Sequence, residues 1–176
     1  MADHKVGSQL PTQSIVLPFE SSKGAEAIEI YEQSGRKAFD WQKLLVSDLM
    51  AVGPDGLWTH QKFGYEVPRQ NGKTGLVEAR AEAGMIMYNE QVIYTAHLQK
   101  TATETFEEMA SFFDTPKLRK YLKDIKTALG REQIILKSGA RVKFLARTRN
   151  GGRGQHGDLL IFDEAQELSV EAQASF

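Results

Sequence analysis

The chain has 176 residues, 41% hydrophobic and 26% charged, so it is long enough to fold around a core of its own. Its 22 basic and 23 acidic residues give a net charge of -1, which excludes nucleic-acid binding driven by overall charge alone. It contains no cysteine, and no apolar run approaches the roughly 18 residues of a membrane span, so disulfide scaffolds, thiolate sites and spanning helices are excluded.

Residues 1–24 are polar and contain two prolines, and we interpret them as an N-terminal arm. Within this arm, Ile15-Val16-Leu17 is the candidate for a short edge strand. No apolar stretch follows Met1, so we predict no signal peptide and expect an intracellular location. Residues 25–176 are expected to form one domain.

Two helices are predicted next, one over residues 25–34 and one that begins near Phe39 with Asp40 as its N-cap. Trp41 and Gln42 follow at the start of the second helix. An aromatic ring and an amide can hold adenine when they lie upstream of a phosphate-binding loop. A solvent-facing glutamine on an amphipathic helix is the alternative, and the residues alone favour it.

A phosphate-binding loop is indicated around Gly72-Lys73-Thr74. A strand-like run over residues 57–67 leads into this loop, and a helical run continues to about Met87. Strand, tight loop and helix with Gly-Lys-Thr are the layout of a P-loop, in which backbone N–H groups attract phosphate. We expect Lys73 to reach the β- and γ-phosphates and Thr74 to place its hydroxyl on Mg²⁺.

The match to the P-loop motif is incomplete. The full motif has a glycine six residues before the lysine, and that position is Val67 here. Only the Gly72-Lys73-Thr74 half is standard, and so short a motif also arises by chance. The alternative is a polar turn capped by Thr74, with a solvated lysine.

The middle of the chain predicts further elements of an α/β fold. Residues 91–96 are typical of a second parallel strand, and residues 98–113 return to helix. Residues 117–126 are expected to form a short basic helix, either as a solvated face, which we favour, or as a nucleic-acid contact. Residues 133–137 and 141–145 predict a hairpin whose second arm continues the main sheet.

Two acidic residues follow the last apolar run. Residues 159–162 are all apolar, which predicts a buried parallel strand that delivers Asp163 and Glu164 to its C-terminal end. We expect Asp163 to hold Mg²⁺ and Glu164 to orient and deprotonate a water. A core strand followed by an acidic turn is the alternative. The preceding loop, residues 147–157, carries three arginines and four glycines, which suits phosphate contact but also a surface loop.

These motifs resemble the large subunit of double-stranded DNA phage terminases, over about residues 41–167. Terminases depart from the usual first glycine of the P-loop as this chain does. The resemblance rests on Trp41-Gln42, on Pro68-Arg69-Gln70-Asn71-Gly72-Lys73-Thr74, on Tyr94-Thr95-Ala96-His97, and on Gly152-Arg153-Gly154 ahead of Leu160-Ile161-Phe162-Asp163-Glu164-Ala165.

The resemblance also implies roles for individual residues. Gln42 would read adenine beside Trp41, and Arg69 would contact the phosphates. Arg153 matches an arginine that some terminases are thought to insert into a neighbouring subunit's site. The implied nucleotide-binding residues are Trp41, Gln42, Arg69, Gln70, Asn71, Gly72, Lys73 and Thr74, the metal-binding residues Thr74 and Asp163, and the catalytic residues Arg69, Lys73, Arg153 and Glu164.

The implied fold is a RecA/ASCE-like P-loop ATPase, α/β, with a central mostly parallel sheet and helices on both faces. The implied function is Mg²⁺-dependent ATP hydrolysis that drives double-stranded DNA into a procapsid, in the cytoplasm of the host cell. Implied partners are DNA, a portal protein, the small terminase subunit and further copies in a ring. We expect the chain to be the N-terminal piece of a larger protein, with an exposed sheet edge and without the nuclease domain.

Two alternatives to a terminase motor remain open. A helicase-type DNA translocase also combines a strand, Gly-Lys-Thr and Asp-Glu. A nucleotide-binding or assembly module without turnover is the other alternative. A second RecA-like domain would favour the helicase, whereas ATP hydrolysis that depends on Glu164 would exclude the module.

Overall fold

The computed structural model describes residues 7–68, 70–147 and 155–168. The chain divides into two compact units. Unit 1 comprises Met1–Glu32 and Arg36–Arg80, and unit 2 comprises Gln33–Gly35 and Ala81–Phe176.

Unit 1 is mainly helical, with one small sheet. The sheet pairs Ser22 with Ala51 in an antiparallel register. The elements of this unit are β1 (Ser21–Ser22), α1 (Gly24–Glu32), α2 (Asp40–Leu49), β2 (Ala51–Val52) and the first half of α3 (Lys73–Tyr88).

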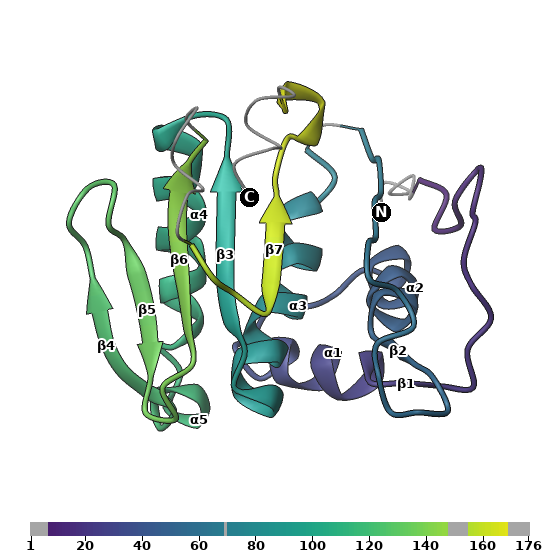
Figure 1. Cartoon of the computed structure of the whole chain (residues 1–176), viewed down its shortest axis with the longest axis horizontal. Coiled ribbons are helices and arrows are strands. Elements are labelled where there is room, and N and C mark those ends of the chain that lie inside the picture. Colours follow the sequence, from purple (N-terminus) through teal and green to yellow (C-terminus); the bar gives the residue numbers. More distant parts are fainter. Residues whose placement is uncertain (1–6, 69, 148–154, 169–176) are drawn as a thin grey trace, which may run out of the picture. The chain divides into compact units, whose positions relative to one another are not determined.

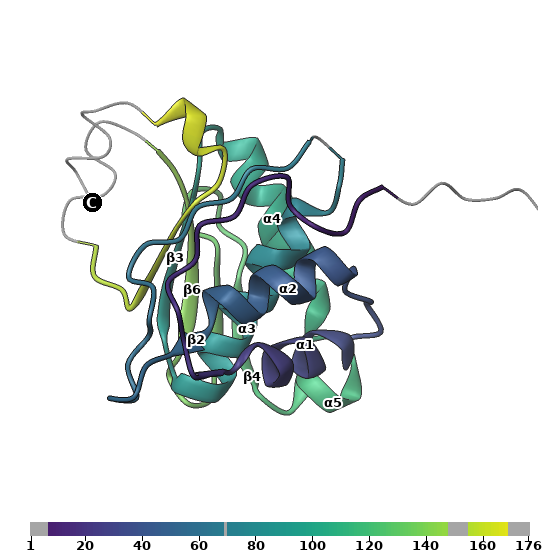
Figure 2. The same cartoon turned by 90° about the vertical axis from the view of Figure 1, so that its right-hand side faces the viewer.

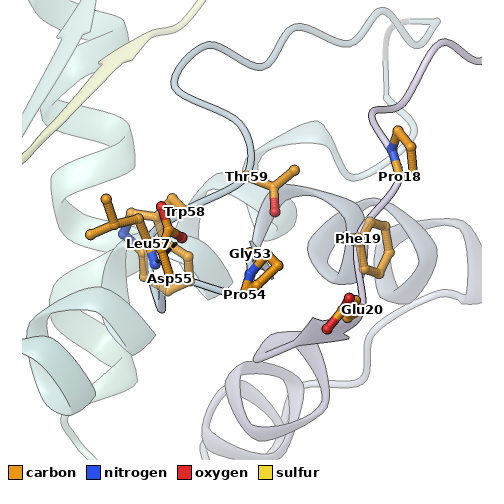
Figure 3. A pocket seen from close by; sticks show the side chains of 9 residues that line it. All are labelled: Pro18, Phe19, Glu20, Gly53, Pro54, Asp55, Leu57, Trp58 and Thr59. Atoms are coloured by element: carbon orange, nitrogen blue, oxygen red, sulfur yellow. Dashed lines mark hydrogen bonds between the residues drawn. The ribbon is translucent and has the colours of Figure 1, made fainter.

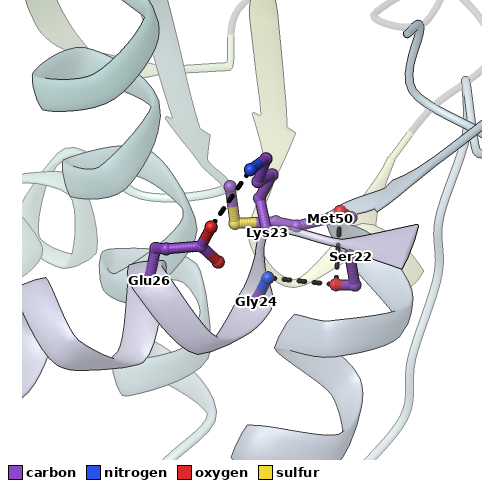
Figure 4. A network of polar contacts seen from close by, with 5 residues as sticks. All are labelled: Ser22, Lys23, Gly24, Glu26 and Met50. Atoms are coloured by element: carbon purple, nitrogen blue, oxygen red, sulfur yellow. Dashed lines mark hydrogen bonds and ion pairs between the residues drawn. The ribbon is translucent and has the colours of Figure 1, made fainter.

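A polar network anchors α1 to the end of α2 (Figure 4). Figure 4 shows the Ser22 hydroxyl accepting a hydrogen bond from the Gly24 N–H at 3.0 Å and lying 3.3 Å from the Met50 carbonyl. The same hydroxyl also donates to the Ser47 carbonyl at 2.6 Å. Gly24 also lies against backbone, since a Cβ there would lie 2.5 Å from the Ser47 Cα. Only glycine therefore fits at the start of α1.

Unit 2 is built on a five-stranded sheet in the order β4-β5-β6-β3-β7, which Figure 1 shows side by side. In Figure 2 the helix α4 lies against one face of this sheet, and within the described part of unit 2 no α-helix covers the other face. The elements are the second half of α3, β3 (Gln91–Ala96), α4 (Gln99–Phe112), α5 (Pro116–Arg119), β4 (Leu122–Lys126), β5 (Gln133–Leu136), β6 (Arg141–Ala146), β7 (Leu159–Phe162) and a short 3₁₀ turn, η1 (Ala165–Glu167).

The sheet is mixed rather than mostly parallel. β3 pairs in parallel with β6 and with β7, whereas β4-β5 and β5-β6 are antiparallel pairs. The predicted strand at residues 91–96 and the hairpin that continues the sheet are confirmed. The parallel direction of β7 is confirmed, but its predicted burial is wrong. β7 lies at the sheet edge among the described residues, and Leu160 is 36% exposed there.

The core of unit 2 gathers on the α4 face of the sheet. Tyr94 and Phe144 are paired across β3 and β6, and their ring centroids lie 5.5 Å apart. Phe106 of α4 meets Phe144 edge-on at 5.4 Å. All three side chains are buried, so an aromatic cluster joins the helix to the two central strands.

Four local predictions are wrong. Ile15-Val16-Leu17 forms no strand. Residues 57–67 form no strand; Trp58 makes an isolated bridge to Val52, and the rest of the run has no partner strand among the described residues. Phe39, and not Asp40, is the N-cap of α2. The predicted helix over residues 117–126 ends at Arg119, because the following residues pair with β5 as β4, and sheet pairing overrides local propensity.

Among the described residues, no helix is both long and apolar enough to cross a membrane.

The aromatic cluster predicts where stability is concentrated. Phe144→Ala should lower the free energy of unfolding by about 3–5 kcal/mol, because the fully buried ring leaves a cavity between β3, β6 and α4. Urea denaturation measures this loss. Leu129→Ala, at a side chain that is 76% exposed, is the control and should change stability by less than about 0.5 kcal/mol. Equal losses in the two variants would contradict the assigned core.

Candidate functional site

The predicted phosphate loop leads directly into α3. Gln70 and Gly72 have φ angles of 61° and 77°, and the helix begins at Lys73. Glycine adopts this left-handed backbone readily, whereas a residue such as Gln70 does so at a cost of about 1–2 kcal/mol. The first N–H groups of a helix have no partner within it and carry partial positive charge, so the start of α3 suits a phosphate.

Gln42 links α2 to this loop. Its amide Nε2 donates to the Gly72 carbonyl at 2.7 Å, and its Oε1 accepts from the Phe39 N–H at 2.7 Å. The side chain is 3% exposed, so the alternative of a solvent-facing glutamine is wrong. A role in reading adenine stays a prediction. The side-chain amide of Gln42 thus hydrogen-bonds both to the start of α2 and to the Gly72 carbonyl.

Side chains of unit 1 lie close to the glycines of the loop and of the first turn of α3. A Cβ at Gly75 would lie 2.8 Å from the Tyr31 hydroxyl and 2.9 Å from the Gln42 Nε2. A Cβ at Gly72 would lie 3.3 Å from the Phe39 ring. Side chains of α1 and α2 therefore pack directly against the loop and its helix, within unit 1.

In unit 2 the acidic pair forms a turn just after β7. The Asp163 N–H continues the sheet by donating to the Thr95 carbonyl at 2.9 Å. Its Oδ1 accepts from the Glu164 N–H at 2.8 Å, and its Oδ2 accepts from the Tyr94 hydroxyl at 2.6 Å. Glu164 has a φ of 51°, in the left-handed region that residues other than glycine rarely adopt. Two residues of β3, Thr95 and Tyr94, therefore hold the turn by hydrogen bonds to Asp163.

Tyr94 fixes the carboxylate of Asp163 from the protein interior. Its hydroxyl also lies 3.1 Å from the Thr105 Oγ, so Thr105 donates to Tyr94 and Tyr94 donates to Asp163. Burial raises the pKa of the Tyr94 hydroxyl, and the neighbouring Asp163 carboxylate raises this pKa further. Tyr94 therefore stays protonated and keeps donating at neutral pH.

Arg147 lies at the same end of the sheet, directly after β6. Its guanidinium donates from Nη1 to the carbonyls of Thr95 and Asp163, at 3.1 and 2.6 Å, and from Nη2 to the carbonyl of Glu164 at 3.0 Å. Burial lowers the pKa of Arg147, and the nearby carboxylates of Asp163 and Glu164 oppose this shift. Arg147 thus joins the ends of β6, β3 and β7.

The carboxylate of Asp163 suits the predicted Mg²⁺ ion. Both carboxylate oxygens of Asp163 accept hydrogen bonds, and a carboxylate has about four acceptor positions, so its chemistry suits a metal or its water shell. Among the described residues, no group of three or more His, Asp or Glu side chains gathers as a protein-only metal cage. Few protein ligands together with phosphate oxygens are the usual setting of Mg²⁺.

Most of the predicted site residues belong to the part of the chain that the structure describes. Arg69 and Arg153 lie outside them. Within unit 1 the structure brings Gln42 to the loop, and within unit 2 it brings Asp163 to Glu164. Half-buried residues are Trp41, Lys73, Thr74 and Glu164, and exposed residues are Gln70, Asn71 and Gly72.

Sequence reasoning missed the supporting residues Tyr31, Tyr94 and Arg147. Tyr94 is predicted to lie in a strand and belongs to the Tyr94-Thr95-Ala96-His97 motif of the resemblance, and Arg147 is predicted to lie in an arginine- and glycine-rich loop. Neither prediction includes support of the acidic turn. Their positions near strand ends were a usable signal, because residues at the carboxyl ends of parallel strands share one edge of a sheet. Only the tertiary pairing shows that they meet Asp163 and Glu164.

Unit 1 also contains an open surface pocket of about 640 Å³ (Figure 3). Its lining includes Phe19, Pro54 and Trp58, and it contains none of the predicted nucleotide-binding residues. It therefore contributes nothing to the phosphate loop.

Gln42→Ala should destabilise the chain by about 1–3 kcal/mol, because the Gly72 carbonyl and the Phe39 N–H both lose their partner. Urea denaturation measures the change, and Gln61→Ala at an exposed glutamine is the matched control. If both variants unfold at the same urea concentration, Gln42 does not hold the loop.

The Tyr94–Asp163 hydrogen bond predicts a pH-dependent stability. Tyr94→Phe should cost about 1.5–3 kcal/mol at pH 7, where the donor is present. An unfolded tyrosine loses its proton near pH 10, whereas the folded Tyr94 holds it more tightly. The stabilisation by this hydrogen bond is therefore fully present below about pH 10 and decreases above it. The difference in the free energy of unfolding between wild type and Tyr94→Phe should accordingly become smaller from pH 9 to 11.

Denaturation across this pH range measures the gap, with Tyr88→Phe at a 41% exposed ring as control. A gap that stays constant to pH 11 would show that the two states do not differ in the pKa of Tyr94.

The comparisons with known proteins agree with these features. A sequence model described as "Terminase large subunit, T4likevirus-type, N-terminal" matches residues 65–174. This match includes the phosphate loop, β3, Arg147 and the acidic turn. No curated protein sequence is similar enough to this chain to be matched.

A solved structure shows a similar fold. It is the crystal structure of the HK97 bacteriophage large terminase, which is 21% identical, with a TM-score of 0.68. The similarity covers 88% of this chain and 34% of that one, so the chain spans about a third of the length of that terminase. Because the family match covers more than half of the chain, the chain belongs to the terminase large subunits, in their N-terminal region.

Proposed function

We propose that this chain is the ATP-hydrolysing motor domain of a terminase large subunit, of the RecA/ASCE-like P-loop class, and that it drives double-stranded DNA into a procapsid. The observation that carries the proposal is the acidic turn at the C-terminal end of β7, where Tyr94 and Arg147 hold Asp163 and Glu164. The family match, which extends over both the phosphate loop and this turn, supports it further.

In this proposal the loop residues bind the nucleotide. The N–H groups at the start of α3 and the ammonium of Lys73 bind the phosphates of ATP. Gln42 and Trp41 bind the adenine side, in addition to the hydrogen bond that Gln42 makes to Gly72. Gln70 and Asn71 contribute to the loop, and Arg69, outside the described residues, adds a phosphate contact.

The acidic turn supplies the chemistry. The Thr74 hydroxyl and the Asp163 carboxylate are the residues that would hold Mg²⁺, and this ion would supply neutralisation of negative charge on the phosphates. Glu164 orients a water molecule and accepts its proton as the water attacks the terminal phosphoryl group. Arg153, outside the described residues, stabilises charge on that group. The buried hydroxyl of Tyr94 donates a hydrogen bond to Asp163 and so holds its carboxylate in one orientation.

The partners follow from the family and are part of the same proposal. They are double-stranded DNA, a portal protein, the small terminase subunit and further copies of the protein in a ring. We also propose that the protein acts in the cytoplasm of the phage's host cell.

Calorimetric titration with ATP and Mg²⁺ tests the binding. Lys73→Ala should weaken binding by about tenfold to a hundredfold, because a charged hydrogen-bond donor to phosphate is lost. Lys62→Ala removes an exposed lysine upstream of the loop and should bind like wild type. Equal affinity of wild type and Lys73→Ala would contradict the P-loop assignment.

Phosphate release tests the hydrolysis. Glu164→Gln should lower kcat by about 10²–10⁴-fold, because the amide cannot accept a proton from water, while ATP affinity stays near that of wild type. If wild type binds ATP but turns over no faster than Glu164→Gln, the chain is a nucleotide-binding module and not an ATPase.

A further inference from the structure

One arginine donates to the ends of two parallel strands from the end of a third. The Arg147 N–H bonds to the Ala96 carbonyl at 2.8 Å, so the residue leaves β6 in register with β3. Its guanidinium then reaches the carbonyls of Thr95 at the end of β3 and of Asp163 and Glu164 after β7. These hydrogen bonds all go to backbone carbonyl oxygens.

The acceptors belong to the turn that needs support. Glu164 has a left-handed backbone, and its N–H is turned back to the Asp163 Oδ1. This conformation persists only where surrounding groups hold it. Arg147 donates to the carbonyls of the two peptide bonds on either side of Glu164, those of Asp163 at 2.6 Å and of Glu164 at 3.0 Å.

We propose that Arg147 is a positioning residue for Glu164: its guanidinium holds the turn after β7 in the left-handed form and so sets the direction of the Glu164 carboxylate. The role in turnover rests on the proposed function. The forked donor of an arginine suits this task, because two nitrogens bind two successive carbonyls at once, which a lysine ammonium cannot do in the same geometry.

The same strand offers a matched control. Arg141 lies at the opposite end of β6, is exposed, and donates from Nε to the Gln91 Oε1 at 2.8 Å. Arg141→Met thus removes an arginine and one hydrogen bond from β6 without touching the acidic turn.

Steady-state ATP hydrolysis is the first test. Arg147→Met should lower kcat by about ten- to a hundredfold, since a misplaced catalytic group costs that much, with KM for ATP within about threefold of wild type. Arg147→Lys should recover part of kcat, and Arg141→Met should match wild type. Folded fractions from circular dichroism correct each kcat. A kcat unchanged after this correction, or a tenfold rise in KM at constant kcat, would overturn the proposal.

Amide hydrogen exchange followed by NMR tests the positioning without any turnover. In Arg147→Met the Glu164 N–H should exchange at least about tenfold faster than in wild type, while the Tyr94 N–H within β3 changes by less than about twofold. Unchanged exchange at Glu164 overturns the role of Arg147. If wild type shows no ATP hydrolysis above Glu164→Gln, the proposed function fails, and this exchange measurement still decides whether Arg147 holds the turn.

Discussion

Parallel pairing of β3 with both β6 and β7 is the constraint on which the rest of unit 2 depends. Because all three strands run the same way, their carboxyl ends meet at one edge of the sheet. Arg147 follows β6 and Asp163 follows β7, and both hydrogen-bond to the end of β3. The pairing thus converts three separate stretches of sequence into one cluster of a carboxylate, a buried phenol and a guanidinium.

Unit 1 supports its loop by different means. The backbone of the loop is strained at Gln70, and the residues that hold it come from the two preceding helices. The Gln42 amide makes two hydrogen bonds, to the Gly72 carbonyl and to the Phe39 N–H. The Tyr31 hydroxyl lies next to Gly75. The phosphate loop and the acidic turn therefore have separate supports, Gln42 and Tyr31 for the loop and Tyr94 and Arg147 for the turn.

Much of the sheet and the acidic pair could be predicted from sequence, because β3 and β7 are short, apolar runs followed by polar residues. Residues 57–67 could not, because alternating aromatics there lack a partner strand among the described residues of unit 1. β4 could not either, since pairing with β5 decides its state and its lysines suggested a helix. The role of Tyr94 could not be predicted either, because its partner Asp163 lies 69 residues away in the sequence.

The central claim to be tested is the proposed function, which predicts that a bound nucleotide affects both the phosphate loop of unit 1 and the acidic turn of unit 2. The most direct test is to follow the backbone amide signals of the isotope-labelled chain while adding Mg²⁺ and a non-hydrolysable ATP analogue. We predict that the signals of Gly72, Lys73 and Thr74 and those of Asp163 and Glu164 shift together, with one dissociation constant. Shifts confined to the loop, with the acidic turn unchanged at saturation, would contradict the account.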